Sequence, residues 1–432
     1  MALWGEYEQV SGSFFTTMNL NLFEPWSASP RADQILGLNQ HQEQGRLPWL
    51  LPLRRQRMAA SAFSFFRGAA AQMAIDLAQQ TNSGEQLQLC GDAHLMNFGF
   101  YASPERTLLF DLNDFDETYP GPFEWDLKRL AVSAVLAAQE LGLKEEEQQT
   151  VVKTLAKHYR SCIARYGERN RLEAWYARLD AEAFIGGISN KHFRSYLETV
   201  AQQARGRDSL SSVRRLCEGE GPSRRFRNDP PTLQTLEAVE NWRPSLNNGY
   251  LDTLRVEVRG LLKHFNVVDQ ALKVVGVGSV GRRCGLALLQ GEHPNDVIVL
   301  QVKEAVASVL AKEESGRQQG QRVVEGQRLM QSASDPFLGW ASTSDGGHCY
   351  WRQFRDWKGS IDLAALDECC LIDYLKLCAE ALAKSHARSG NPAEINGLLE
   401  SIPRYPSQLA IYAQSYAKQT ALDHNAFAGA FA

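Results

Sequence analysis

The strongest constraint on the fold is a glycine-rich turn set between two apolar, β-branched segments. Residues 272–291 read LKVVGVGSVGRRCGLALLQG, and residues 296–305 read DVIVLQVKEA. A G-x-G-x-x-G pattern occurs in two settings. In a dinucleotide-binding domain the third glycine opens a helix, as a nicotinamide-dependent dehydrogenase would require. Here Gly281 is followed by the pattern of a strand, a turn and a second strand, which favours a hairpin that covers phosphates.

This hairpin predicts a nucleotide site in a β-rich part of the chain. Lys303 stands near the end of the second strand, in VIVLQVK. The V-A-I-K sequence of protein kinases places a lysine there, and that lysine pairs the α- and β-phosphates of ATP. The structural alternative is an edge-strand lysine in water. The predicted ATP-binding residues are Gly276, Gly278, Ser279, Gly281 and Lys303.

A helix predicted over about 312–332 would supply a glutamate that holds Lys303 in place. Its sequence SGRQQGQRVVEGQRLMQ offers Glu325, and Glu313 and Glu314 are alternatives nearer the helix start. A solvated helix face is the other explanation for Glu325. The ordered set of glycines, lysine and glutamate favours a catalytic assignment for Lys303 and Glu325.

A second constellation lies much earlier in the chain. In GDAHLMN, residues 91–97, four residues separate Asp92 from Asn97. Kinase catalytic loops have the same D-x-x-x-x-N spacing. The aspartate of such a loop orients or deprotonates an incoming hydroxyl, and the asparagine gives an oxygen to Mg²⁺. Asp92 is therefore the predicted catalytic residue, and Asn97 is a predicted metal ligand.

An acidic segment, DLNDFDE at 111–117, follows an apolar strand pattern and would complete the metal site. Mg²⁺ takes hard oxygen ligands, commonly one or two carboxylates together with substrate phosphates. Asp111 has the usual sequence spacing from the asparagine, whereas Asp114 fits the surrounding sequence motif, D-F-D-E-x-x-x-G-P-x-x-W-D-L, better. Asp116 is a third, weaker choice. Loop aspartates also cap helices without binding anything, so the assignment depends on the joint pattern.

Three neighbouring residues have other predicted roles. His94 is expected to fix the loop by hydrogen bonding rather than to accept a proton. Asp126 lies in the first turn of a predicted helix, FEWDLKRLAVSAVLAAQELGL, and is expected to cap or anchor it. Arg67 of FFRG would contact a phosphate or the acceptor, or else form a structural salt bridge.

The order of the two constellations is reversed relative to a kinase, where the glycine-rich loop and the lysine come first. A circular permutation restores the order if the break follows ALAKSHARSG, 381–390, which is similar to the helix end before a kinase catalytic loop. Permutation is tolerated where the break lies in exposed chain. The segment YWRQFRDWK, 350–358, is then expected to form the hinge between lobes, where adenine would bind through backbone groups.

Long motifs make the chain similar to a bacterial family, domain of unknown function 2252. RMAASAFSFFRG, GDAHLMNFG, DLNDFDETYPGPFEWDLKRL, VGVGSVGRRC, LQVKEA and QRVVEGQRLMQ carry this resemblance over roughly residues 50–425. GDAHLMNFG and DFDETYPGPFEWDL also resemble blocks of aminoglycoside-phosphotransferase-like kinases. That resemblance implies that Asp92 is the catalytic aspartate, that Asn97 binds Mg²⁺, and that Asp114 or Asp111 is the other metal ligand.

We therefore predict an α+β chain with a protein-kinase-like, two-lobed and circularly permuted fold. The predicted parts are an irregular N-terminal extension (1–56), a helical lobe with the catalytic and acidic loops (57–235), a β-rich nucleotide-binding lobe (236–358) and C-terminal helices that pack on the helical lobe (359–432). A length of 432 residues is consistent with two lobes. The Arg-, Ser-, Gly- and Pro-rich stretch 205–231 indicates a long loop.

The composition is typical of a soluble globular protein, with 44% hydrophobic and 22% charged residues. A formal net charge of −4 gives no reason to expect nucleic-acid binding. No apolar run is long enough to span a membrane, and the start, MALWGEYEQVSGSFF, lacks the pattern of a signal peptide. Eight cysteines without C-x-x-C pairs indicate reduced, mostly buried thiols, so we expect a cytoplasmic protein.

The predicted function is that of an ATP- and Mg²⁺-dependent phosphotransferase. It would move the γ-phosphoryl group to a hydroxyl or amine of a small-molecule or protein acceptor. Two alternatives use the same residues. One is a nucleotide-binding regulator that transfers nothing, and the other is an enzyme that moves AMP in place of the phosphoryl group.

Overall fold

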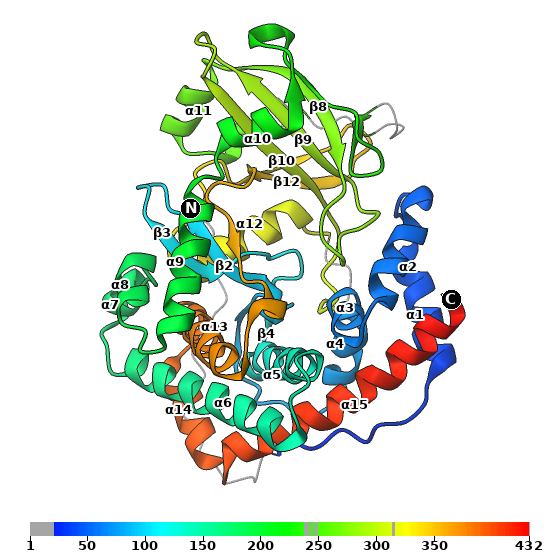
Figure 1. The fold of residues 1–432 in the computed structure, drawn as a ribbon, viewed down its shortest axis with the longest axis vertical. Coiled ribbons are helices and arrows are strands. Elements are labelled where there is room, and N and C mark those ends of the chain that lie inside the picture. The colour runs from blue at the N-terminus through cyan, green and yellow to red at the C-terminus, as the bar shows by residue number, and fades with distance from the viewer. Residues whose placement is uncertain (1–20, 237–241, 243–244, 247–248, 313–315, 432) are drawn as a thin grey trace.

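A computed structural model describes residues 21–236, 242, 245–246, 249–312 and 316–431. An antiparallel sheet lies above a larger helical body, and helix α12 (Gln319–Met330) lies between them (Figure 1). The chain mixes helix and sheet, as the α+β prediction requires. Among the described residues, no helix is both long enough and apolar enough to cross a lipid bilayer.

The sheet has the strand order β11-β12-β10-β9-β8-β7, and every neighbouring pair is antiparallel. The elements of this part are β7 (Leu233–Thr235), α11 (Val256–Leu262), β8 (Asn266–Lys273), β9 (Cys284–Gln290), β10 (Val297–Ala305), β11 (Gly339–Ser342) and β12 (His348–Gln353). The glycine-rich segment connects β8 to β9, so the expected hairpin is confirmed. Strand β9 follows Gly281 in place of the helix that a dinucleotide-binding domain needs.

Strand β10 shows how the sheet presents polar side chains to the helical body. Successive side chains of a strand point to opposite faces. Val302 packs in the apolar cluster on one face, and Val299 packs in a second cluster on the other face, with α10 (Ser209–Leu216). The side chains of Gln301 and Lys303 lie on the same face of β10 as that of Val299. This face of β10 is therefore apolar at the end that α10 covers and polar at the end that lines a cavity.

The helical body is built around α5 (Phe123–Glu140), which is buried on nearly all sides. A helix of this kind is typical of a core position. It packs against α6 (Glu145–Gly167), α13 (Glu368–Ser389) and α15 (Tyr405–Phe431). The same body contains α7 (Arg171–Tyr176), α8 (Ala181–Gly186), α9 (Lys191–Arg205), α14 (Pro392–Ser401), β1 (Gln86–Leu89), β2 (Phe98–Ala102), β3 (Leu108–Leu112), β4 (Tyr119–Pro122) and β13 (Gly359–Ser360).

The short strands of the helical body bring the two predicted loops together. The catalytic-loop segment lies between β1 and β2, and the acidic segment begins in the last two residues of β3 and continues toward β4. Strand β1 pairs with β4, and β2 pairs with β3, so both loops lie between the same two strand pairs. At Gly91 a Cβ atom would lie 2.1 Å from the carbonyl oxygen of Glu117, and the φ angle is +84°. Only glycine permits this close approach of the two loops.

The N-terminal part is helical where the sequence indicated an irregular extension. Helices α1 (Ala32–Glu43) and α2 (Leu51–Ala59) precede α3 (Ala62–Gly68) and α4 (Ala70–Ala78). The predicted boundary at residue 56 was wrong, because it falls inside α2. Both α1 and α2 pack against α15, a contact between sequence-distant segments that a local pattern does not report.

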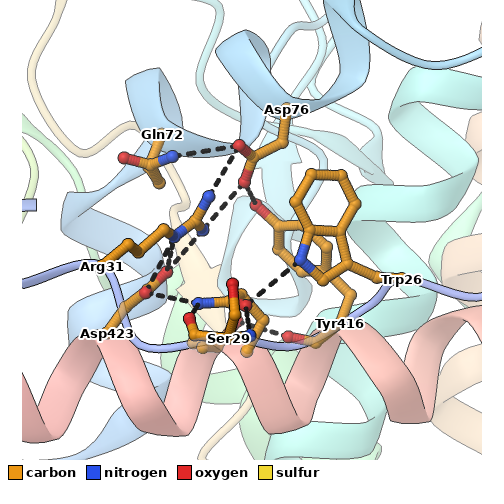
Figure 2. A network of polar contacts seen from close by, with 9 residues as sticks. Trp26, Ser29, Arg31, Gln72, Asp76, Tyr416 and Asp423 are labelled. Atoms are coloured by element: carbon orange, nitrogen blue, oxygen red, sulfur yellow. Dashed lines mark hydrogen bonds and ion pairs between the residues drawn. The ribbon is translucent and has the colours of Figure 1, made fainter. Parts of the chain in front are cut away.

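Figure 2 shows a buried polar network that joins the start of the described chain to α15. The guanidinium of Arg31 contacts Asp76 of α4 at 2.8 Å and Asp423 of α15 at 2.6 Å. The hydroxyl of Tyr416 donates to Asp76 Oδ2 at 2.7 Å. Buried carboxylates need such partners, because an uncompensated charge inside a protein is costly. The segment before α1 is therefore part of the helical body.

Two connections join the sheet to the helical body. One crosses at residues 206–208, between α9 and α10, and the other crosses at 354–358, between β12 and β13. They are bonded to each other, since the backbone amide of Trp357 donates to the carbonyl oxygen of Arg207 at 2.7 Å. The second crossing lies inside the segment predicted as the hinge.

The structure that follows the first crossing contradicts two predictions. Helix α10 packs against the sheet, so the predicted lobe boundary at residue 235 is too late. The stretch 205–231 was predicted as a long loop but contains α10, β5 (Cys217–Glu218) and β6 (Arg225–Phe226). Its leucine, valine and cysteine side chains find an apolar partner surface only in the folded sheet.

Candidate functional site

A cavity of about 780 Å³ separates the sheet from the helical body. The glycine-rich segment and β10 border it on the sheet side, and the loops after β1 and β3 border it on the helical side. The predicted site residues that line it are Asp92, Asn97, Asp114, Gly276, Gly278, Ser279 and Lys303. Asp111, Gly281 and Glu325 lie outside its lining.

Lys303 joins the two constellations across this cavity. Its Nζ lies 2.9 Å from Asp116 Oδ2 and 3.2 Å from Asp114 Oδ1, and the residue is 5% exposed. Burial alone would lower the pKa of Lys303, but the two carboxylates outweigh burial and hold the pKa well above its ordinary value. The lysine therefore carries its charge into the cavity at neutral pH.

The carboxylates of Asp114 and Asp116 in the acidic loop differ in their hydrogen-bond partners and in their exposure. Asp116 receives Lys303 on Oδ2 and the hydroxyl of Tyr350 on Oδ1, at 2.5 Å. The side chain of Asp114 is 42% exposed. Burial would raise the pKa of Asp114, but Lys303 and Arg352 outweigh it and hold the pKa below its ordinary range. Asp114 thus presents a charged carboxylate to the cavity.

Asp111, the competing metal-ligand candidate, is part of a different contact. Its carboxylate pairs with Lys384 of α13, and both side chains are almost fully buried, at 1% and 0% exposure. Burial lowers the pKa of Lys384, and the nearby Asp111 opposes that change. Asp111 therefore does not reach the cavity, and its assignment as a metal ligand is corrected. Asp111 still lies within β3, so its side chain points into the helical body.

Asn97 has the geometry expected of a ligand-binding amide. Its Nδ2 donates to the carbonyl oxygens of Asp92 and Asp114, at 3.0 and 2.9 Å. These two bonds fix the side-chain orientation. Its Oδ1 is buried and has no hydrogen-bond partner among the described residues. A buried oxygen without a partner is costly, so this atom is suited to a cation or another donor that enters the cavity.

Asp92 lies in the cavity beside two cationic or titratable side chains. The Nε of Arg129 donates to Asp92 Oδ1 at 2.5 Å, and His94 Nε2 lies 3.6 Å from Asp92 Oδ2. Burial lowers the pKa of His94 to about 4. The histidine is neutral at pH 7 and is a weak proton acceptor there. Arg129 was not identified from the sequence, although a single arginine inside the apolar helix segment DLKRLAV was a possible signal.

Asp126 anchors the catalytic loop instead of capping its own helix. Its two carboxylate oxygens accept from the backbone amides of Cys90 and Gly91, at 2.8 and 3.0 Å. The start of α5 has no side-chain cap. The loop conformation before Asp92 thus depends on a residue of α5.

Arg322 of α12 holds the acidic loop from the other side. Its Nη1 donates to the carbonyl oxygen of Thr118 at 2.5 Å, and its Nη2 donates to the carbonyl oxygens of Asp116 and Val306, each at 2.9 Å. One side chain therefore connects the acidic loop with the chain after β10. Sequence inspection missed it because the interaction joins segments that are far apart in the chain.

The glycine-rich loop is bound on its carbonyl side by the N-terminal helices. The Nη1 of Arg46 donates to the carbonyl oxygens of Gly278 and Val280, at 2.8 and 2.6 Å. Arg57 donates to the carbonyl oxygen of Gly276 at 2.7 Å. Gly281 has a φ of +87° and would bring a Cβ atom to 3.0 Å from Arg46, so glycine is needed there. The loop carbonyls are thereby occupied by cations.

Glu325 does not hold Lys303. Its carboxylate contacts Arg317 and accepts from Gln321 Nε2 at 2.7 Å. Val323 and Gln327 of the same helix line the cavity, and a residue between them in a helix points elsewhere. The predicted role of Glu325 is therefore corrected, and Asp116 occupies the position of the lysine partner. The alternatives Glu313 and Glu314 lie outside the described residues.

Arg67 lines the cavity, and it forms no ion pair within the described part of the chain. Its Nε is buried without a partner. Burial lowers the pKa of Arg67, and the nearby Asp92 opposes this. The structural salt bridge that was one of its two predicted roles is thus not formed, and the side chain faces the cavity on the Asp92 side.

A family model described as "Uncharacterized protein conserved in bacteria (DUF2252)" matches residues 46–430. This range covers most of the 432 residues. The chain belongs to the DUF2252 family. No curated protein and no solved structure matches this DUF2252 chain. The matched range begins at Arg46, which binds the glycine-rich loop, and ends within α15.

The DUF2252 cavity combines groups of complementary chemistry. A charged lysine and backbone amides of the glycine-rich loop suit phosphate oxygens. A carboxylate and a buried amide oxygen suit a hard divalent cation. Hydrogen bonds and an ion pair hold the side chains of Asn97 and Lys303, which gives these two groups a defined position before any ligand binds.

Proposed function

We propose that this DUF2252 protein is an ATP- and Mg²⁺-dependent phosphotransferase with a kinase-like, circularly permuted arrangement. The observation that carries the proposal is the contact of Lys303 with Asp114 and Asp116, which lie 189 and 187 residues away in the sequence. Each constellation alone has a structural explanation. One bound nucleotide that contacts both constellations would explain why they line the same cavity.

The available donors fit the metal. Asn97 Oδ1 is a buried oxygen without a partner, and Asp114 has an exposed, charged carboxylate. Mg²⁺ commonly takes one or two such oxygens and completes its octahedron with phosphates and water. Asn97 and Asp114 would hold the ion, which when bound neutralises phosphate charge.

The phosphates would lie beneath the glycine-rich loop and beside Lys303. Arg46 and Arg57 hold carbonyl oxygens of this loop, and amides of the same loop would bind the anionic oxygens. Lys303 would exchange part of its contact with Asp114 for a phosphate, while Asp116 and Tyr350 keep the ammonium in place.

Asp92 would orient the acceptor hydroxyl and take its proton. The acceptor oxygen forms a bond to the γ-phosphorus while the bond from that phosphorus to the β–γ bridging oxygen breaks, and ADP leaves with the bonding electrons. Arg129 holds Asp92 Oδ1, so Oδ2 is the oxygen that faces the acceptor. Rate enhancement would come mainly from positioning and charge stabilisation.

The position of α13 supports the permuted reading. The end of this helix lies beside β1, which leads into the catalytic loop, and Ser389 Oγ donates to the carbonyl oxygen of Gln88 at 3.3 Å. A kinase connects a helix end to its catalytic loop directly. Here the two are adjacent in space and distant in sequence, as a permutation requires.

A nucleotide-binding regulator without transfer activity is the second candidate. The observation that favours it is the contact of Arg129 Nε with Asp92 Oδ1 at 2.5 Å, because it occupies one of the two oxygens of the proposed proton acceptor. We place either function in the cytoplasm, since all eight cysteines are free and seven of them are buried.

Calorimetric titration with ATP and Mg²⁺ tests the proposal. We expect metal-dependent binding that weakens at least tenfold in Lys303→Ala and in Asp114→Ala, because each removes a charge that faces the phosphates or the metal. Lys376→Ala is the matched control, since Lys376 is a half-exposed lysine of α13 outside the cavity lining. Absence of ATP binding with and without metal would overturn the proposal.

Turnover separates the two candidates. An enzyme hydrolyses ATP slowly when no acceptor is present and consumes it faster when an acceptor is added. Asp92→Asn should abolish this consumption, while the affinity for ATP changes less than about threefold. A regulator binds ATP and consumes none. Equal ATP consumption by the wild-type protein and Asp92→Asn would remove Asp92 from the mechanism.

A further inference from the structure

The part of the cavity that lies against the two crossings between sheet and body is strongly basic. Four cations line it, and we refer to them as the hinge-end cations: Arg207, Arg352, Arg355 and Lys358. Arg207 lies on the first crossing, Arg352 on β12, and the other two on the second crossing. The Nη1 of Arg207 donates to the carbonyl oxygen of Lys358 at 2.7 Å, so both crossings contribute to one surface.

The hinge-end cations lack direct ion-pair partners. Within the described ranges none of them forms an ion pair with a carboxylate, and no hydrogen bond of the Lys358 ammonium is formed. Arg352 donates to neutral oxygens, Gln301 Oε1 at 3.0 Å and the carbonyl oxygen of Asn113 at 3.2 Å. Such a concentration of positive charge in a low-dielectric cavity is costly unless an anion enters.

Two other carboxylates of the cavity lining have partners of their own. Asp356 pairs with Arg106 at 2.7 Å. Asp335 accepts from the backbone amides of Gln353 and Phe337. Burial lowers the pKa of Lys358 to about 7, and repulsion from Arg352 adds to this effect. Asp114 and Asp116 interact electrostatically with Arg352, and Asp114 with Lys358, so the protein compensates this positive charge only in part.

Two features of the same region do not suit an adenine ring. A purine ring needs apolar surfaces above and below it and free backbone groups along one edge. Gln301 occupies the face of β10 two residues before Lys303, and it is bonded to Arg352. The amides of Phe354 and Trp357 are bonded to the carbonyl oxygens of Val299 and Arg207, at 2.8 and 2.7 Å.

The backbone of the crossing supports an anion-binding role. Arg355 has a φ of +56°, a conformation that costs energy for a residue other than glycine. The surrounding hydrogen bonds hold it there. This conformation is one in which the Arg355 side chain joins the lining of the cavity.

We propose that the hinge end of the cavity binds a phosphate-type polyanion, held by the hinge-end cations, and not an adenine ring. The inference rests on the proposed function, because it assigns the remaining part of the same cavity. The polyanion has two possible sources. It is either the terminal phosphates of the nucleotide, bound in the reverse direction, or a phosphate group of the acceptor.

The two sources lead to different reactions. If the β- and γ-phosphates occupy the hinge end, the α-phosphate lies near Asn97 and Asp114. The acceptor oxygen then forms a bond to the α-phosphorus, the bond from that phosphorus to the α–β bridging oxygen breaks, and pyrophosphate leaves with the bonding electrons. Asp92 takes the acceptor proton, and the product carries AMP. If the anion belongs to the acceptor, the product carries a phosphoryl group.

Calorimetry with inorganic tripolyphosphate and with adenosine tests the anion site in the full chain. We expect tripolyphosphate to bind and adenosine to bind at least tenfold more weakly. Lys358→Met and, independently, Arg355→Gln should each weaken tripolyphosphate binding at least fivefold, whereas Lys376→Met should not. Stronger binding of adenosine than of tripolyphosphate, or unchanged tripolyphosphate binding in both folded hinge-end variants, would overturn the inference.

Competition identifies the source and separates this inference from the proposed function. Displacement of tripolyphosphate by ATP in a Lys358-dependent manner assigns the anion to the nucleotide, and mass spectrometry of the product should then show added AMP. Simultaneous binding of both assigns it to the acceptor. Lys358-dependent binding of tripolyphosphate without any binding of ATP would support the anion site and overturn the phosphotransferase proposal.

Discussion

Two aspartate–lysine pairs arise from the same acidic segment, DLND, and differ in their surroundings. Asp111 pairs with Lys384, and both side chains are almost fully buried, at 1% and 0% exposure. Asp114 pairs with Lys303, and the side chain of Asp114 is 42% exposed. The first pair lies between β3 and α13 inside the helical body. The second pair spans the cavity between the body and the sheet.

The difference between these pairs separates a structural contact from a ligand site. In the buried pair each charge is the main compensation for the other, so neither is available to a ligand. In the open pair a phosphate or a metal ion can replace one contact, because solvent and Asp116 stabilise what remains. Chemical identity of the residues does not distinguish the two cases, but exposure does.

The largest expected effect is on stability. Lys384→Met leaves the Asp111 carboxylate buried without a partner, and we expect the free energy of unfolding to fall by about 3–5 kcal/mol. Urea denaturation followed by tryptophan fluorescence measures it. Lys303→Met is the matched change in the open pair and should cost less than Lys384→Met, because water reaches the Asp114 and Asp116 carboxylates that remain. The double variant Asp111→Asn/Lys384→Met should recover part of the loss. Equal losses for the two lysine variants would erase the distinction between the pairs.

The second effect is on ligand binding. Asp114→Asn should weaken Mg²⁺-dependent ATP binding by about tenfold to a hundredfold, since a charged metal ligand becomes neutral. Its unfolding free energy should change by less than about 1 kcal/mol, because the side chain is partly exposed. Calorimetry and urea denaturation of one preparation give both values. A variant that unfolds easily yet binds ATP normally would reverse the roles assigned to the two aspartates.

A third effect concerns pH. Burial lowers the pKa of Lys358 to about 7, repulsion from Arg352, Lys303 and Arg355 adds to this effect, and Asp114 opposes it. The amine is mainly charged at pH 6 and mainly neutral at pH 8.5. The affinity advantage of the wild-type protein over Lys358→Met for tripolyphosphate, without divalent cation, should therefore be about threefold to tenfold larger at pH 6. Because the anion raises the pKa, calorimetry at pH 8 should detect proton uptake on binding. A pH-independent ratio would show that Lys358 does not contact the anion.

The smallest effect is expected at Glu325. This glutamate contacts Arg317 and not Lys303, so Glu325→Gln should change ATP affinity by less than about twofold. Asp116→Asn, which removes the observed partner of Lys303, is the comparison and should have a larger effect. Titration of both variants with ATP and Mg²⁺ measures which of the two carboxylates contributes to ATP binding. A tenfold loss in Glu325→Gln would return that residue to the site.

Local patterns were sufficient to predict several elements of this chain. The glycine-rich hairpin, the strand that carries Lys303, the loop with Asp92 and Asn97, and helix α13 are all encoded by short-range periodicity and turn residues. Such patterns depend on neighbours within a few residues. Most of the free cysteines were likewise expected to be buried, and seven of eight are.

Other features depend on partners that are distant in the sequence. Helices α1 and α2 pack on α15, and α10 packs on the sheet, so their sequences alone indicated irregular chain. Arg129, Arg322 and Arg46 became site residues only through contacts with distant loops.

The sequence by itself determined the chemical content of the site: a glycine-rich turn, a lysine at a strand end, and a loop with aspartate and asparagine. Only the tertiary structure decided which carboxylate meets the lysine. Asp111 and Asp114 are three residues apart, and the end of β3 after Leu112 sends one into the helical body and the other into the cavity. That outcome depends on where a strand ends and on which helices cover it, and these are properties of packing between distant segments.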